Sequence, residues 1–391
     1  MFSLFRGREK LFLACDIGGT RVKLVAFRAS RQSREAALVD YFEKEFSREE
    51  AHDSETYLRK AVQLLSEFSE KIREKENEYP RAALISIPHG MTVSRHIEFR
   101  TVRPNPGSTL TAHELGEVWQ RSKERATVIP EELQLGVEGW NLLTFELERI
   151  TLDGYTLLHE DGDWHGRELE FSVISTFWRE GLHEIVGETS KYTAFRPIFV
   201  PRLFLIRDYF RFAEGRGASG VLCDMSAEDC TLFVFHGGEL SAFASFPFGG
   251  GDVTRAVAKS MYIRERDAEV LKRQWSAGRV AVGTAKKIER AVLPLFDFWK
   301  REWSMFLQNA SEHAVIRPHF YLSGGGSILP TFPVALSQAA WYENFATSEH
   351  ATVSRLSESA TSQTLLSNWP VHSMGDTVIF ALILRMIQKY L

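Results

Sequence analysis

The sequence predicts an α/β protein of two similar domains that share a cleft, with a small α+β module inserted in the first half. Three separated segments support this prediction. Two of them, at 12–27 and 220–235, consist of an apolar strand, a tight acidic turn and a second apolar strand. The third, at 320–330, joins a short apolar strand to a helix through three consecutive glycines. Such turns expose backbone N–H groups to phosphate oxygens, so the sequence predicts a phosphate-binding cleft.

The first turn contains an acid, two glycines and a hydroxyl directly after a strand. Gly18 and Gly19 allow the backbone to approach a phosphate closely, and Thr20 can donate a hydrogen bond to it. Asp16 can hold a hydrated cation. Because Gly-Gly-Thr is also common in plain hairpin turns, this segment alone leaves both interpretations open. The two later segments favour the phosphate interpretation, since related turns recur there.

The second turn has the same layout but a different chemistry. It begins with Asp224 and continues Met-Ser-Ala-Glu-Asp-Cys, without a glycine and with the added acids Glu228 and Asp229. These side chains hinder close backbone approach, and the two acids repel a phosphate. If two charge-assisted hydrogen bonds are lost, at roughly 1.5–3 kcal/mol each, affinity falls by about a hundredfold to over ten-thousandfold. We therefore expect any nucleotide binding to be weak.

The composition is that of an ordinary globular protein. With 44% hydrophobic and 25% charged residues over 391 positions, the chain is long enough for two or three domains. Its 47 basic and 51 acidic residues leave a formal charge of −4 without a basic block, so no nucleic acid partner is expected. Cys15, Cys223 and Cys230 lie in or beside apolar strands without metal-ligand spacing, which predicts buried, reduced thiols.

The two ends of the chain bear on membrane contact. No signal peptide or bilayer-spanning segment is expected, because the opening decapeptide lacks an apolar h-region and no segment has roughly 20 apolar residues. The apolar residues at 376–391 predict a helix buried in the core, with a membrane-contacting helix as the alternative. The apolar and basic residues at 1–10 predict a frayed start, with contact to an anionic membrane surface as the alternative.

The expected elements follow from hydrophobic periodicity and capping signals. Before the insert we expect a strand at 37–46, a helix at 51–79 and a strand at 82–88. The insert is expected to contain strands at 97–102, 141–150 and 169–177, and a helix from Thr111 through Trp119 with a Thr111/Glu114 capping box. A strand and a helix at 198–212 lead to a glycine-rich linker at 214–220 and to helices at 254–261, 265–275 and 280–306. Residues 350–368 are expected to form a surface loop.

These expectations divide the chain into a first domain at 1–83 and 179–213, an inserted subdomain at 84–178 and a second domain at 214–391. The order of two phosphate-type hairpins and a glycine-rich turn is that of the actin/Hsp70/sugar-kinase superfamily. Over most of its length the chain resembles the FtsA/PilM family of bacterial actin-like proteins. The position of the insert matches that family, and the phrases Leu152-Asp-Gly-Tyr155 and Gly166-Arg-Glu-Leu-Glu-Phe171 resemble the end of the FtsA insert. The stretches 248–254 and 267–272 resemble the family's sequence after the second phosphate loop.

The resemblance implies an α/β, actin-like two-domain ATPase fold with an inserted α+β subdomain of the SHS2 type. It also assigns roles in ATP binding to positions that match the family's motifs. These are Asp16, Gly18, Gly19, Thr20 and Lys23 at the first loop, Asp224 at the second, and Gly249 and Gly250 at the adjoining turn. Glu269 and Lys272 are assigned to the ribose or base, and Gly324, Gly325, Gly326 and Ile328 to the adenosine. Asp16 and Asp224 are assigned to Mg²⁺, through water.

Residues three apart project from one face of a helix, so Glu269 and Lys272 can act together; a solvated ion pair is the alternative. We find no convincing general base, and Glu228 in its loop is more typical of a solvated acid. The catalytic residue is therefore unknown. The expectation is a weak ATPase at most, with ATP and Mg²⁺ as the implied cofactors.

Three functions remain open. The leading one is an FtsA-like adaptor that links the FtsZ filament to the membrane through the FtsZ C-terminal peptide and self-associates into filaments or dimers. The alternative is a PilM-like cytoplasmic platform of type IV pilus or secretion assembly that binds a PilN-like membrane-protein peptide. The third is a sugar or acyl-phosphate kinase, which the degenerate second loop disfavours.

The two quoted phrases favour division. The opening decapeptide and the lack of a visible C-terminal targeting helix favour the pilus system. We expect a cytoplasmic protein peripheral to the inner membrane, with indirect or weak membrane contact.

Overall fold

The computed structural model describes residues 9–30, 36–134, 139–157, 162–311, 316–337, 351–356, 366–367 and 376–391. Its contacts divide the chain into two units. The main unit comprises Met1–His89 and Thr193–Leu391, and the inserted unit comprises Gly90–Tyr192. Of the opening decapeptide, residues 1–8 lie outside the described part, and so does the expectation of a frayed start there.

The first sheet of the main unit contains, in order, β15 (Leu366–Ser367), β3 (Ala36–Glu45), β2 (Arg21–Ala29), β1 (Lys10–Ile17), β4 (Ala82–Ile87) and β9 (Arg196–Pro201). β1, β2 and β3 form an antiparallel meander, whereas β4 lies parallel to β1 and β9 parallel to β4. β1, β2 and β4 are buried almost throughout because helices cover the sheet. The ends of β1 and β4 thereby lie side by side.

The helices on this sheet begin and end at recognisable signals. α1 (Arg48–His52) starts at a capping box of Ser47 and Glu50. α2 (Ser54–Glu76) packs on β1 and β2, starts where the Asp53 side chain accepts hydrogen bonds from two backbone N–H groups, and ends at the left-handed Asn77. α6 (Arg202–Ala213) follows β9 directly and packs on β9 and β4. The expected helix at 51–79 is therefore divided at Asp53.

The second sheet repeats the plan of the first. It contains, in order, β12 (Glu239–Phe246), β11 (Cys230–His236), β10 (Gly220–Met225), β13 (His319–Ser323) and β14 (Thr352–Arg355). β10, β11 and β12 form an antiparallel meander, and β13 and β14 continue the sheet in parallel. Each sheet thus places an acidic turn at the end of a central strand, beside a parallel neighbour.

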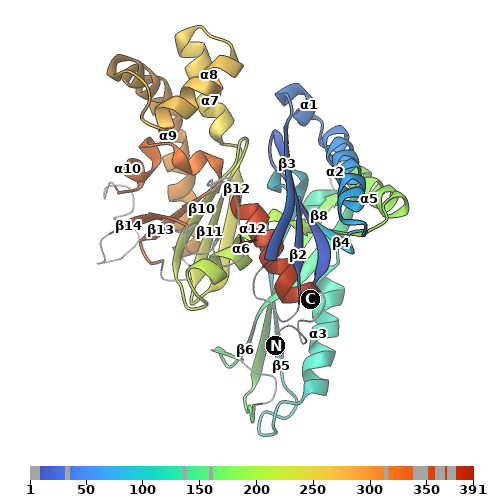
Figure 1. Cartoon of the computed structure of the whole chain (residues 1–391). Coiled ribbons are helices and arrows are strands. Elements are labelled where there is room, and N and C mark those ends of the chain that lie inside the picture. Colours follow the sequence, from blue (N-terminus) through green and yellow to red (C-terminus); the bar gives the residue numbers. More distant parts are fainter. Residues whose placement is uncertain are drawn as a thin grey trace, which may run out of the picture. The chain divides into compact units, whose positions relative to one another are not determined.

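Aromatic side chains dominate the core beside the second sheet. α7 (Gly250–Met261), α8 (Glu265–Ser276), α9 (Val282–Ser311) and α10 (Thr331–Ser337) accompany it, with a short 3₁₀ helix at Gly325–Ile328 (Figure 1). Trp299 and Trp303 from α9 are fully buried and pack against each other and against Phe332 and Phe320. Aromatic pairs of this kind add about 0.5–1.5 kcal/mol beyond their burial, so they fix α9 firmly.

The C-terminal helix packs on the first sheet. α12 (Thr377–Arg385), red in Figure 1, contacts β1, β4 and α6 and continues into a π-helical turn at Met386–Tyr390. Every residue of α12 is buried, which confirms the expected buried helix. The residues of α12 fall within the range expected for the second domain, 214–391, but the helix covers a face of the first sheet. β15 likewise pairs with β3, and β14 and β15 both fall in the expected loop at 350–368.

The inserted unit is a four-stranded antiparallel sheet with one long helix. The order is β5 (Thr92–Val102), β8 (Glu168–Arg179), β6 (Trp140–Leu152) and β7 (Tyr155–Thr156). α3 (Ala112–Ala126) covers this sheet, the short α4 (Glu131–Gln134) follows it, and α5 (Glu180–Tyr192) ends the unit. The Thr111 side chain caps α3 through the N–H of Glu114, whereas the Glu114 carboxylate pairs with Arg103 instead of closing the box. We keep the three-part division as a proposal and place the insert at Gly90–Tyr192, because β4 belongs to the first sheet.

Two further features can be compared with the sequence. Cys15, Cys223 and Cys230 are all buried and free, as expected. None of the described helices is long and apolar enough to cross a membrane.

Candidate functional site

The acids of the two hairpin turns lie close together in the main unit. Asp16 near the end of β1 and Asp224 near the end of β10 are 5% and 1% exposed. Between them lies Arg202, the first residue of α6, whose Nε donates to Asp224 Oδ2 at 2.8 Å and whose Nη1 lies 3.9 Å from Asp16 Oδ1. The glycine-rich turn reaches the same place, since a Cβ built on Gly324 would lie 2.8 Å from Asp224 Oδ1. The three segments that the sequence singled out therefore converge.

Burial controls the ionisation of this cluster. It raises the pKa of Asp16 above the usual 3.8, although Arg202, Lys23 and a hydrogen bond from Ser86 oppose the shift. Burial lowers the pKa of Arg202, but the neighbouring Asp224 and Asp16 raise it by more, so the guanidinium stays charged. Burial also lowers the pKa of His89, whose Nε2 finds no partner among the described residues. Oδ1 of Asp224 is likewise buried and unpaired there.

The first turn is closed on itself and on the second turn. The Gly18 N–H donates to the Arg21 carbonyl at 2.8 Å, and the Tyr57 hydroxyl donates to the Gly18 carbonyl at 3.0 Å. A Cβ built on Gly19 would lie 2.8 Å from the Cβ of Ala227. The two turns are thus in van der Waals contact, and no phosphate group fits between Gly19 and Ala227.

The N-terminus of α7, which could bind an anion, is occupied by the second turn. The N–H groups of Gly250 and Gly251 donate to the carbonyls of Ser226 and Ala227 at 2.9 and 2.7 Å. The Gly249 N–H donates to the Asp252 carboxylate at 2.9 Å. Helix N-termini bind phosphate through free N–H groups, and these donors are satisfied within the chain.

Glu269 and Lys272 form a closed network, with their ion pair at 2.6 Å. Lys272 Nζ also donates to the Gly250 carbonyl and to Thr254 Oγ1, both at 2.9 Å. Thr254 Oγ1 donates to Glu269 at 2.6 Å. These groups tie α8 to the start of α7, which favours the ion-pair alternative over contact with a ribose.

The remaining predicted residues have local partners or open surroundings. Lys23 pairs with Asp376 at 2.5 Å, and the Thr20 carbonyl accepts from the Phe46 N–H at 2.8 Å. Gly324 adopts φ of 78° and, like Gly326, lies against Met225. Gly325 has nothing within 4 Å of an added Cβ, and Ile328 is half-buried.

These residues do not fit a nucleotide in the described arrangement. The N–H groups of Gly18, Gly250 and Gly251 are bonded within the chain, the turns touch, and a guanidinium lies on both proposed metal ligands. Among the described residues, no group of three or more His, Cys, Asp or Glu side chains could hold a metal ion. The ATP and Mg²⁺ site therefore stays a prediction that this geometry does not support. Sequence reasoning missed Arg202; the one signal was a basic residue directly after Pro201 in an apolar stretch.

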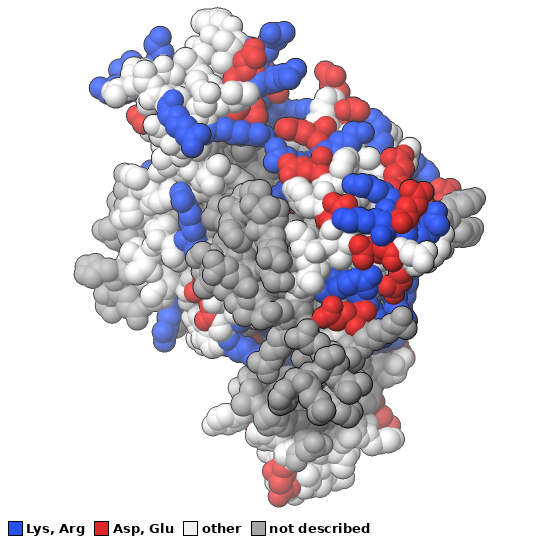
Figure 2. Space-filling model, in the orientation of Figure 1, with Lys and Arg blue, Asp and Glu red and all other residues white. Residues whose placement is uncertain are grey.

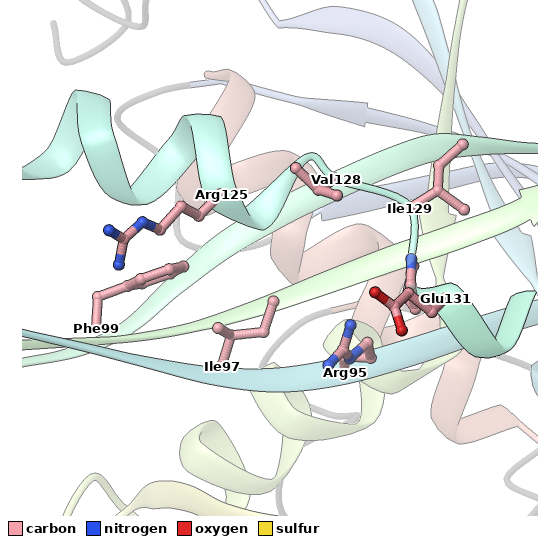
Figure 3. A pocket seen from close by; sticks show the side chains of 8 residues that line it. Arg95, Ile97, Phe99, Arg125, Val128, Ile129 and Glu131 are labelled. Carbon is pink, nitrogen blue, oxygen red and sulfur yellow. The ribbon is translucent and has the colours of Figure 1, made fainter. Parts of the chain in front are cut away.

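The inserted unit carries a pocket of about 480 Å³ between β5 and the end of α3 (Figure 3). Arg95, Ile97 and Phe99 alternate along one face of β5 and form one wall. The opposite wall comes from the end of α3 and the turn into α4, with Arg125, Val128, Ile129, Pro130 and Glu131. Arg95 and Arg125 are exposed, and neither side chain has an ion pair within the described part of the chain. The pocket therefore combines apolar side chains with two exposed arginines and one carboxylate, that of Glu131.

The two phrases that favoured a division protein belong to one turn. Asp153 and Gly154 connect β6 to β7 with φ of 48° and 84°, the left-handed values of a tight hairpin turn. The Asp153 carboxylate accepts from the N–H groups of Arg167 and Glu168. A Cβ on Gly166 would lie 2.6 Å from Leu152 Cγ. Residues of both phrases contact each other in this turn, which accounts for them structurally. They therefore do not distinguish a division role from a pilus role.

The face shown in Figure 2 carries interspersed charges over α2 and β3. Arg28 pairs with Glu76 and Glu78, and Lys71 pairs with Asp40. Because basic and acidic side chains are paired there, α2 and β3 carry no patch of one charge sign on this face.

No family model matches the sequence, and no curated protein matches it. Among solved structures, a chain of a PilM–PilN type IV pilus biogenesis complex is similar, with a TM-score of 0.63 at 17% identity over 96% of this chain and 98% of that chain. EutJ from Carboxydothermus hydrogenoformans has a TM-score of 0.48 at 13% identity over 97% and 90% of the two chains. A non-polymerising MamK mutant bound to AMPPNP has a TM-score of 0.44 at 10% identity over 98% and 100%.

The protein has the actin-like ATPase fold, as the sequence predicted. Within that class it is similar over nearly its whole length to the pilus biogenesis protein. At this identity the similarity establishes the fold alone, and the preference for an FtsA-like protein is not confirmed.

Proposed function

We propose that this chain is a PilM-like platform protein that binds a short, extended segment of a PilN-like membrane protein. The observation that carries the proposal is the structural similarity, over 96% of this chain, to a chain of a PilM–PilN type IV pilus biogenesis complex, at a TM-score of 0.63. In this proposal the membrane protein, rather than a helix of this chain, provides the contact with the inner membrane. The protein then acts by binding, and catalysis is not part of the proposal.

The pocket on the inserted unit is the surface that we propose for the segment. Ile97 and Val128 offer apolar contact, and Arg95 and Arg125 offer charge that an acidic side chain can neutralise. β5 is an edge strand of its sheet, since it pairs with β8 and with no second described strand. An extended segment that adds to such an edge places alternate side chains on one face, as Arg95, Ile97 and Phe99 are placed. The expected ligand is therefore an extended segment with apolar and acidic side chains.

No separate structural observation supports a division role through FtsZ. The phrases that suggested it are explained by the Asp153–Gly154 turn. A kinase role is disfavoured, because carbonyls of the second turn accept hydrogen bonds from the N–H groups at the start of α7 that a phosphate would need.

The test is fluorescence anisotropy with two labelled peptides, the PilN segment present in the solved complex and the FtsZ C-terminal peptide. We expect the PilN segment to bind with micromolar affinity, about −8 kcal/mol, and the FtsZ peptide not to bind. Arg95→Glu and Arg125→Glu should each weaken binding about tenfold or more, because each replaces an attractive charge by a repulsive one.

Arg121→Glu is the matched control, since it makes the same change on α3 outside the pocket. It should leave the affinity within about twofold. Binding of the FtsZ peptide alone would establish the division role instead. PilN binding that is unaffected by both pocket variants would move the site elsewhere while leaving the function intact.

A further inference from the structure

The buried Arg202 joins the two hairpin turns across the main unit. Its side chain is 9% exposed, Asp16 and Asp224 are 7% and 1% exposed, and the two acids belong to different sheets. A guanidinium with donors on several edges can contact two carboxylates at once, which an ammonium does less well. Arg202 therefore makes a contact to each half of the fold from one position.

The position of Arg202 follows from the local chain path. Pro201 ends β9, and α6 begins at the next residue, so the Arg202 side chain leaves at the junction of a strand and a helix. β9 lies beside β4, whose Ser86 hydroxyl donates to Asp16 Oδ1 at 3.0 Å. Arg202 and Ser86 thus both contact the Asp16 carboxylate.

Two carboxylates that share a buried site repel each other, so either one of them holds a proton or a cation lies between them. A divalent metal held by Asp16 and Asp224 is one such cation, and the sequence predicted it. The structure places a guanidinium there instead, 2.8 Å from one carboxylate and 3.9 Å from the other. Since Gly19 also touches Ala227, the turns meet around this arginine.

We propose that Arg202 is a built-in cation that holds the two acidic turns together in place of a metal-nucleotide complex. The closed state of the actin-like cleft is then a property of the chain itself. Closure does not wait for Mg-ATP, which separates this protein from one that uses nucleotide to open and close.

The experiment measures thermal unfolding of the full chain with and without Mg²⁺ and ATP at about 5 mM each. For the wild type we expect a midpoint shift below about 1 °C, because neither compound binds the folded state. Arg202→Met should lower the midpoint by roughly 5–10 °C, since two buried acids lose their cation. Arg202→Met should also gain a Mg²⁺-dependent rise that the wild type lacks.

Arg207→Met is the matched control, because Arg207 is a buried, ion-paired arginine of the same helix that pairs with Asp208 outside the cluster. It should lose stability without gaining a response to Mg²⁺. If Arg202→Met does not fold, the double variant Arg202→Met/Asp224→Asn is measured in its place. It should fold, because it removes one of the two acids that repel each other. A rise of several degrees with Mg-ATP in the wild type would overturn the proposal. A double variant no more stable than Arg202→Met would overturn it as well.

Discussion

The two hairpins of the main unit share a backbone plan but differ at the turn. In each, an acid is the penultimate residue of the central strand: Asp16 in β1 and Asp224 in β10. In each, a serine of the parallel neighbour lies alongside: Ser86 donates to Asp16, and Ser323 is paired in register with Asp224. The first turn is Gly18-Gly19-Thr20, whereas the second is Ser226-Ala227-Glu228-Asp229.

The first turn has two glycines without side chains, whereas the side chains of the second turn hold its shape and pack against its neighbours. Ser226 Oγ bonds to the Asp229 carboxylate at 2.7 Å and holds the second turn in shape. The same turn places Ala227 on Gly19 and its carbonyls on the N-terminus of α7. The two hairpins therefore carry an acid at the same place, but the turn of the second is filled by side-chain and carbonyl contacts.

The largest effect is expected where α7 meets the second turn. In Gly249→Ala the new Cβ would lie 2.4 Å from the carbonyl carbon and oxygen of Ala227, so backbone must move. We expect a loss of about 3 kcal/mol in the free energy of unfolding, measured by urea denaturation. Gly325→Ala is the control, because nothing lies within 4 Å of its added Cβ, and it should change stability by less than about 0.5 kcal/mol. An equal loss in the free energy of unfolding for both variants would show that the second turn is not tightly packed against α7.

A second prediction concerns the acid of the first hairpin. Because burial raises the pKa of Asp16 in the folded state, its ionisation opposes folding. The stability of the wild type relative to Asp16→Asn should therefore be highest below pH of about 3.8 and fall as pH rises through the raised pKa. The fall is about 1.4 kcal/mol for each unit by which the pKa is raised. Urea denaturation of both proteins between about pH 3 and 8 measures it, and a difference that grows with pH would contradict the prediction.

The smallest effect is expected at Glu228, the half-buried acid of the second turn. Glu228 lies 3.0 Å from Arg48 and 3.6 Å from Arg255, and its side chain is 38% exposed. Glu228→Gln should therefore cost less than about 1 kcal/mol, and the cost should shrink in salt at about 1 M. Glu289→Gln on α9 is the reference, since Glu289 is exposed and has no ion pair among the described residues. A salt-independent loss well above this value would mean that Glu228 has a buried role.

Much of the fold could be predicted from local pattern. The strands at 12–17 and 82–87 and the apolar C-terminal helix have periodicity and composition that leave few alternatives. The place of α12 could not be predicted, because an apolar helix fits any uncovered sheet face and only the assembled fold shows that β1 and β4 offer one.

The candidate site was predicted in part for the same reason. Asp16, Asp224 and the glycine-rich turn were identified from residue type and order, and the structure brings them together. Arg202 was missed because its role depends on two acids that are remote in sequence. Glu269 and Lys272 were assigned to a ligand, although their spacing on a helix equally suits the ion pair that they form.

The sequence by itself determined the strands, the acidic turns and the repeated order of elements, since these depend on the local alternation of apolar and polar residues. The tertiary structure alone decided what those turns contact. Whether a backbone N–H faces a ligand, a carbonyl or a guanidinium is set by neighbours far along the chain, and their positions follow from packing rather than from local sequence.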